Sequence, residues 1–369
     1  MNKKVIFFVT NEFRSLYKFR LDIIRLFKNK NFDIHILGQF DGHEQKFRDL
    51  GISKLHNIPF SGRSLTFKSN ILAFLKLFNI YRLNKPNFSF QYTIKPSIYG
   101  AIISKIFNTP NIIMITGISY FLTKNNLFTK VAIFIMKRAY SSVDEIFFTN
   151  TSDVKIFQKL KILHTQKYSI IPGAGYVYQD NMNYTEKSEK INFLLVGRLV
   201  KEKGVEEYIN AAMKYSKNKN INFTLVGSYN NDKHHINKNL LEQSIKDNSI
   251  FYYDFMDNID YLYTNASCFV LPSYKEGMST VLFEAISYGI PIITTNVPGC
   301  IDIIPDTEHG FICKPKDLES LEQCIIEFLE SDSKHLKKIT YNAHVRCKKH
   351  FNRKDILDKY LNILNELYD

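Results

Sequence analysis

The chain has 369 residues, of which 45% are hydrophobic and 23% charged. This composition is typical of a globular protein, it excludes a mainly disordered chain, and the length predicts two domains. The formal net charge of +13 is uneven, because residues 1–180 contribute +16 and residues 181–369 contribute −3. Such a basic N-terminal half favours an anionic partner, which could be nucleic acid or an anionic membrane. The alternative is a lysine-rich face that is simply solvated.

Targeting and redox signals are weak. No apolar stretch approaches the roughly 18–20 residues of a membrane-spanning helix. Met1–Thr10 has two lysines and a short apolar run, which favours a first β-strand over a signal peptide. The five cysteines are an odd number without CxxC spacing, so neither a disulfide framework nor a zinc site is expected. A reducing cytoplasm is the expected compartment.

Strands and helices alternate from the N-terminus onward. The first series of predicted strands is Val5–Val9, Asp33–Leu37, Phe88–Tyr92, Asn111–Ile115 and Glu145–Phe148. Helical stretches separate these strands, and this alternation predicts a parallel sheet with helices on both faces.

A second series follows the polar segment Gln179–Lys190, which is predicted to be a linker or a long loop. Its predicted strands are Ile191–Val196, Asn222–Val226, Cys268–Leu271 and Pro291–Thr295. Its predicted helices are Gly204–Lys214, Lys238–Lys246, Thr280–Tyr288, 318–330 and 353–368. Two doubly wound units are expected, with ligands beyond the carboxyl ends of their strands.

The strongest motif lies in residues 272–285, where a strand is followed by a glycine-containing loop and a helix start near Ser279. The free amides and the dipole of a helix start favour an anion such as a diphosphate. Gly277 lets a ligand approach the backbone, and the carboxylates of Glu276 and Glu284 suit sugar hydroxyls. The alternative interpretation makes Ser279 an ordinary helix cap and leaves both glutamates in solvent.

A second motif, residues 195–204, again has the order strand, loop and helix start. Arg198 and Lys203 lie in its loop, and a guanidinium with an ammonium forms a chemically sensible diphosphate clamp. The alternative is that both are ordinary surface cations.

Together the two motifs resemble the retaining, sugar-nucleotide-dependent glycosyltransferases of family 4. The resemblance rests on Val196-Gly197-Arg198-Leu199, Glu202-Lys203-Gly204, Leu271-Pro272-Ser273, Glu276-Gly277, Glu284-Ala285 and Gly289-x-Pro291, in that order. It implies the α/β GT-B fold, in which two Rossmann-like doubly wound domains face each other across a cleft and a C-terminal helix returns to the N-domain. The expected domains are residues 1–172 for the acceptor, residues 173–350 for the nucleotide sugar, and residues 351–369 for that helix.

The resemblance also implies a role for each matching residue. Arg198 and Lys203 would bind the donor diphosphate, Glu276 would contact the donor sugar near the reacting centre, and Glu284 would bind the ribose hydroxyls. The remaining candidates complete the phosphate site: Gly277, Met278, Ser279 and Thr280. Fixed cations and amides would then stabilise the leaving group, so no metal is expected. The resemblance also implies a UDP-sugar as the donor.

Residues 92–100, 115–120 and 296–300 look like bacterial enzymes of surface-polysaccharide and oligosaccharide assembly. The resemblance implies transfer of an N-acetylhexosamine or hexose from UDP to a polyprenyl-diphosphate-linked or other glycan acceptor. Thr116 and Gly117 would line the donor sugar, where many members of the family have a histidine.

The acceptor phosphate has three candidate ligands. Lys95 is one by the same resemblance, with a solvated lysine as the alternative. Arg14 and Arg20 are the others, because residues 10–14 lack the paired glycines usual in the family. A surface role for the two arginines is equally open.

The expected protein is a peripheral enzyme on the cytoplasmic face of the inner membrane, with a nucleotide sugar, a lipid-linked acceptor and an anionic membrane as partners. The alternative on the same fold is a sugar-nucleotide epimerase, and the spacing of Glu276 and Glu284 favours the transferase. A nucleic-acid-binding protein is less favoured because no binding module is recognisable.

Overall fold

The computed structural model describes residues 3–60, 67–117, 122, 126–177, 184, 188–229, 235–256 and 258–368. The chain forms two compact units. The first unit comprises Met1–Ala174 and Lys354–Asp369, and the second comprises Gly175–Arg353. Most of the predicted linker Gln179–Lys190 lies outside the described residues.

The first unit is built on a parallel sheet of seven strands in the order β3-β2-β1-β4-β5-β6-β7. The strands are β1 (Val5–Glu12), β2 (Asp33–Gln39), β3 (Lys54–Asn57), β4 (Phe88–Tyr92), β5 (Asn111–Ile115), β6 (Glu145–Phe148) and β7 (Lys167–Ile170). Strands β1, β4, β5 and β6 are buried because helices cover both faces, and most of their residues are accordingly apolar, although β4 also buries Ser89 and Gln91.

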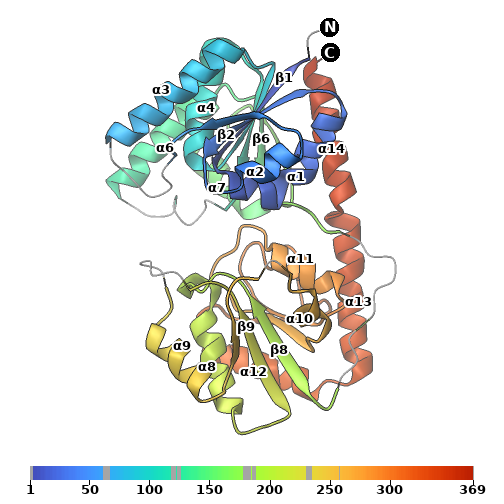
Figure 1. The fold of residues 1–369 in the computed structure, drawn as a ribbon. Coiled ribbons are helices and arrows are strands. Elements are labelled where there is room, and N and C mark those ends of the chain that lie inside the picture. The colour runs from blue at the N-terminus through green and yellow to red at the C-terminus, as the bar shows by residue number, and fades with distance from the viewer. Residues whose placement is uncertain are drawn as a thin grey trace. The chain divides into compact units, whose positions relative to one another are not determined.

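Helices lie on both faces of this sheet (Figure 1). One face carries α1 (Phe13–Asn29), α2 (Glu44–Asp49) and α14 (Arg353–Tyr368). The opposite face carries α3 (Phe67–Asn84), α4 (Ile94–Phe107), α6 (Leu127–Tyr140) and α7 (Thr151–Lys159).

The C-terminal helix α14 belongs to the core of the first unit. The ring of Tyr360 is fully buried, and its centroid lies 5.5 Å from that of Phe90 and 5.1 Å from that of Phe147. Ile356, one turn earlier, joins the same cluster. The last helix therefore returns to the N-terminal sheet, as the family resemblance implies.

The second unit has a parallel sheet of six strands in the order β10-β9-β8-β11-β12-β13. The strands are β8 (Ile191–Val196), β9 (Ile221–Val226), β10 (Phe251–Tyr253), β11 (Cys268–Leu271), β12 (Ile292–Thr295) and β13 (Phe311–Cys313). The helices are η1 (Lys201–Lys203), α8 (Val205–Tyr215), α9 (Lys238–Lys246), α10 (Asp260–Thr264), α11 (Thr280–Ser287), α12 (Leu318–Glu330) and α13 (Ser333–His350).

The topology of the second unit positions its motifs. Strands β8, β11 and β12 are consecutive in the sheet and parallel, so the loops at their carboxyl ends emerge at one edge. Residues 197–204, 272–279 and 296–300 are these loops. Motifs that are about 75 and 100 residues apart in the chain are thereby brought together.

Within the described part of the chain, no helix is both long and apolar enough to cross a membrane.

Candidate active site

Two loops of the second unit are joined through their backbones. One follows β8 and contains Lys203, and the other follows β11 and contains Glu276. The N–H of Tyr274 in the second loop donates to the carbonyl oxygen of Glu202 in the first over 2.8 Å. The two motifs found separately in the sequence therefore form one structure.

Gly204 explains why the loops can approach so closely. Its φ is +68°, and a Cβ added there would lie 2.0 Å from the carbonyl oxygen of Pro272. Any other residue would be strained and would also collide with the backbone. The glycine after Lys203 thus fixes the distance between the two loops.

The side chains of the two loops meet at a single carboxylate oxygen. The Nζ of Lys203 lies 2.5 Å from Oε1 of Glu276, and the hydroxyl of Ser273 donates to the same oxygen over 2.8 Å. The Lys203 and Glu276 side chains are 18% and 8% exposed. No described residue donates to Oε2 of Glu276, which leaves this oxygen for a ligand hydroxyl.

Residues 296–300 pack against the Glu276 loop. Gly299 has a φ of +82°, and a Cβ there would lie 2.7 Å from the carbonyl oxygen of Gly277 and 2.9 Å from that of Glu276. Burial, and secondly the charge of Glu276, raises the pKa of the Cys300 thiol to about 12. Cys300 therefore stays a neutral thiol near the carboxylate at neutral pH.

Helix α11 begins immediately after this loop, with Thr280 as its first residue. Ser279 stands at the N-cap position, but its hydroxyl makes no capping bond, and its buried Oγ has no partner among the described residues. Ser279 therefore stands at the cap position without capping the helix through its side chain. A helix start without a side-chain cap can offer its N–H groups to an anion. Met278 packs against the core beside it.

Glu284 lies one turn into α11 and is exposed. Its Oε2 accepts a hydrogen bond of 2.8 Å from the hydroxyl of Tyr263 on α10. The ring of Tyr263 stacks on Tyr288 at 5.1 Å. Burial, and secondly the negative charge of Glu284, raises the pKa of Tyr263 well above its usual value, so this phenol remains a donor. Tyr263 thereby orients the second glutamate.

Arg198 is exposed, and its side chain forms no hydrogen bond or ion pair with the residues that the structure describes. Gly197 beside it has open space where a Cβ would be. The guanidinium is thus not committed to the described parts of the protein and remains able to bind an anion.

Thr116 and Gly117 belong to the first unit, directly after β5. Thr116 is exposed, whereas the N–H of Gly117 donates to Oδ2 of the buried Asp153 over 3.1 Å. Asp153 also accepts from the side-chain amide of Asn150 over 3.1 Å. The backbone N–H of Gly117 is therefore already used in a hydrogen bond within the protein. Of the two residues, the exposed Thr116 is the one that could contact a sugar.

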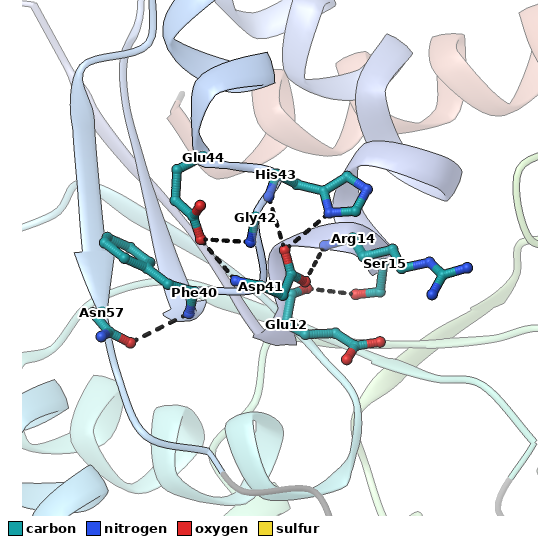
Figure 2. A network of polar contacts seen from close by, with 9 residues as sticks. All are labelled: Glu12, Arg14, Ser15, Phe40, Asp41, Gly42, His43, Glu44 and Asn57. Atoms are coloured by element: carbon teal, nitrogen blue, oxygen red, sulfur yellow. Dashed lines mark hydrogen bonds and ion pairs between the residues drawn. The ribbon is translucent and has the colours of Figure 1, made fainter. Parts of the chain in front are cut away.

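The start of α1 binds a carboxylate of the chain, as Figure 2 shows. Oδ2 of Asp41 accepts a hydrogen bond of 2.7 Å from the backbone N–H of Arg14. Glu44 Oε1 accepts from the N–H of Asp41 over 2.7 Å and holds that loop. An acidic side chain thus occupies the start of the helix that carries Arg14 and Arg20, the two arginines predicted to bind an acceptor phosphate, although the Arg14 side chain itself is exposed.

The other two acceptor candidates differ in accessibility. Arg20 is only 5% exposed, its Nη2 lies 2.9 Å from the sulfur of Met114, and its guanidinium lies over the ring of Tyr92 at 5.5 Å. This burial argues against a contact between Arg20 and an acceptor. Lys95 is half-buried in the first turn of α4, and burial lowers its pKa.

Sequence reasoning missed two residues of these sites: Tyr263 beside Glu284, and Asp41 at the start of α1. Each lies on another loop or helix, at a separation along the chain that no local sequence pattern indicates. Ser273 belongs to the Leu271-Pro272-Ser273 motif, but its hydrogen bond to Glu276 was not predicted. No three His, Cys, Asp or Glu side chains in the described residues could hold a metal together.

Two family models match the chain. The model for glycosyl transferases group 1 covers residues 179–346, and the model for glycosyl transferase 4-like proteins covers residues 4–150. Each unit has a parallel sheet of the Rossmann type, and the joined loops lie in the second unit. With the two family matches, these features define a glycosyltransferase of the GT-B fold. The chain belongs to the family 4-like group of these enzymes. These matches favour the transferase over the epimerase.

The chain is similar over most of its length to curated enzymes. It is 27% identical to the capsular polysaccharide biosynthesis glycosyltransferase CapM of Staphylococcus aureus, over 93% of this chain and 92% of that one. It is 26% identical, over 89% and 90%, to the N,N'-diacetylbacillosaminyl-diphospho-undecaprenol alpha-1,3-N-acetylgalactosaminyltransferase of Campylobacter jejuni. The structure of Anabaena HepE with UDP and glucose has the same fold, with a TM-score of 0.77, 15% identity, and 98% and 100% coverage.

Proposed function

We propose that this glycosyltransferase moves a hexose or N-acetylhexosamine from a UDP-sugar to a polyprenyl-diphosphate-linked glycan, with retention of the anomeric configuration. The observation that carries the proposal is the contact between Lys203 and Glu276 across the two joined loops. It sets a cation for a diphosphate beside a carboxylate for a sugar, which are the two ends of a nucleotide-sugar donor. The relatives whose names specify capsule synthesis or a diphospho-undecaprenol acceptor support the acceptor class.

Each group has a defined task in this proposal. Lys203 and Arg198 neutralise the diphosphate, and the uncapped start of α11 donates N–H groups to it. As the bond from the sugar to the diphosphate breaks, negative charge grows on the leaving oxygen, and these fixed donors stabilise it. Oε2 of Glu276 accepts from a donor-sugar hydroxyl, while Tyr263 holds Glu284 toward the ribose.

An acceptor anchored in a membrane requires the enzyme to reach that membrane. We propose peripheral attachment of the first unit to an anionic leaflet, on the cytoplasmic face where nucleotide sugars are available. The charge of +16 on residues 1–180 supports this attachment.

The test is turnover of a panel of UDP-sugars with a polyprenyl-diphosphate glycan acceptor, followed by mass spectrometry, with NMR of the anomeric proton in the product. We expect one UDP-sugar to be transferred with its α-configuration retained. Arg198→Ala should lower transfer about a hundredfold, while Lys219→Ala, an exposed cation of the same unit, should not. Inversion of configuration, or equal turnover in both variants, would contradict the proposal.

A further inference from the structure

One long segment of the chain lacks negative side chains altogether. The sequence contains 36 acidic residues, but none lies between Leu50 and Val143, where twelve lysines and arginines occur. This segment supplies α3, α4 and α6, which cover one face of the first sheet (Figure 1). At neutral pH every charged side chain of these three helices is positive.

Helix α6 is apolar on the side that faces solvent. Its inward side is ordinary, with Met136 and Tyr140 buried in the core. Its outward residues are also large and apolar, and five are exposed: Leu127, Phe128, Val131, Phe134 and Ile135. Leu127 is 78% and Phe134 61% exposed. A surface helix normally presents polar residues at these positions, so the stripe has a reason other than folding.

The neighbouring helices extend the apolar surface. Helix α4 packs between α3 and α6, and Ile106 near its end is exposed. Helix α3 exposes Ile71, Leu72 and Leu75. We call these nine residues, with the exposed cations Lys76, Lys105, Lys130 and Arg138, the α3–α4–α6 face.

A pocket of about 310 Å³ between α4 and α6 combines both kinds of side chain. Its apolar lining includes Ile106, Phe134 and Ile135, and Lys105 and Arg138 line it as well. The guanidinium of Arg138 lies 5.6 Å from the centre of the Phe134 ring. Neither cation forms an ion pair with a described residue. Long basic side chains beside apolar groups are the arrangement that meets phosphates above acyl chains.

We propose that the α3–α4–α6 face docks on an anionic phospholipid bilayer, with the outward stripe of α6 in the interfacial layer and the cations on lipid phosphates. The proposed function supplies the reason for docking, which is to bring the enzyme to a lipid-linked acceptor, and the inference rests on that function in this respect alone. A nucleic acid would engage the cations but leave the apolar stripe in water. A second copy of the chain would bring like charges together. A bilayer uses both features.

The test is co-sedimentation of the full-length protein with phosphatidylcholine vesicles, alone and with about a third of the lipid as phosphatidylglycerol. We expect binding to the anionic vesicles that weakens with salt. The variant Lys105→Glu/Arg138→Glu should bind at least about tenfold more weakly. Its control, Lys217→Glu/Lys219→Glu, makes the same charge change on an exposed turn of the second unit and should bind like the wild type.

A second pair of variants tests the apolar stripe. Leu127→Ser/Val131→Ser/Phe134→Ser should lose about tenfold or more in vesicle affinity and retain a salt-dependent remainder. Its control replaces Ile245, Ile326 and Val345, which are exposed apolar residues of the second unit, by serine. Calorimetric binding of UDP should be the same in all four variants. A wild type that does not bind UDP would contradict the proposed function and leave the vesicle result to stand by itself.

Three results would overturn the docking surface. They are equal binding to neutral and anionic vesicles, equal losses in the face and control variants, and a dimer by light scattering that only the face variants convert to monomers. The last result would make the face an interface between copies.

Discussion

The Lys203–Glu276 loops of the second unit and the α3–α4–α6 face of the first use charge in opposite ways. Around Glu276 the charges are few, partly buried and paired, and backbone contacts at Gly204 and Gly299 hold them in place. On the face they are numerous, exposed and of one sign. The first arrangement suits a compact ligand whose atoms have fixed positions, and the second suits an extended surface that presents the same charge everywhere.

The largest effect should follow from breaking the pair. Lys203→Met should lower kcat about 10²–10³-fold, roughly 3–4 kcal/mol, because it removes a charge that stabilises the leaving diphosphate. Steady-state kinetics with saturating acceptor measures this loss. Lys201→Met is the matched control, since Lys201 lies two residues earlier in η1, is 56% exposed, and has its Nζ 3.7 Å from Glu206 Oε1.

The pair also makes a prediction about coupling. Glu276→Gln and Lys203→Met should each cost stability, because each leaves its partner without its charged neighbour in a largely buried place. In thermal unfolding, the double variant should lose less than the sum of the two single variants. Simple additivity would mean that the two side chains do not interact in solution.

The first unit should lose stability in acid because of His35. Burial above all lowers the pKa of His35 from 6.5 to about 4. Its Nδ1 is 3.1 Å from Nε2 of His56, Asp33 is 3.5 Å from its Nε2, and Lys54 is bound to Asp33. A proton is therefore taken up more readily by the unfolded chain.

The stability that follows from His35 is complete above pH 6.5 and is lost as the pH falls toward 4, up to about 3 kcal/mol. Urea unfolding at a series of pH values measures it, with fluorescent labels on each unit. In His35→Gln the acid loss should be smaller. An unchanged pH profile would contradict this assignment.

A smaller effect is expected at the second glutamate. Tyr263→Phe removes the hydroxyl that donates to Glu284 and keeps the ring that stacks on Tyr288. We expect a roughly fivefold rise in the KM for the UDP-sugar, about 1 kcal/mol, with kcat unchanged. A fall in kcat at unchanged KM would place Tyr263 in the chemical step.

The smallest effect should come from chelation. If the cations and amides around the α11 start suffice for the diphosphate, EDTA leaves transfer unchanged. Loss of activity in EDTA with rescue by Mg²⁺ or Mn²⁺ would show that a metal takes part.

Burial decides which elements the sequence could predict. The predicted ranges Phe88–Tyr92, Asn111–Ile115, Glu145–Phe148, Ile191–Val196 and Cys268–Leu271 match the strands residue for residue, because these strands are largely buried and mostly apolar. The edge strands β3, β7, β10 and β13 were missed. The residues of β3, β7 and β10 are mostly exposed or half-buried and carry little apolar pattern, whereas β13 is mostly buried but only three residues long. Helix α13 was missed too, since its apolar residues are sparse among lysines and histidines.

The same distinction holds for the candidate site. Glycines and charged residues that follow buried strands were found, because the topology of a parallel sheet fixes where those strands end. The contact of Lys203 with Glu276, the hydroxyl of Tyr263 and the carboxylate of Asp41 depend on how separate loops pack, which no local spacing encodes.

The return of α14 to the first unit has a consequence for synthesis on the ribosome. The strands of that unit emerge first, but the core around Phe90 and Phe147 lacks Ile356 and Tyr360 until the second unit has been translated. At about 5–20 residues per second, the interval of some 180 residues lasts roughly 10–40 s. The unit that begins folding first is therefore completed last, and until then the nascent chain exposes the apolar side chains that α14 later covers, to which chaperones can bind. A fragment ending near residue 174 would leave these side chains uncovered.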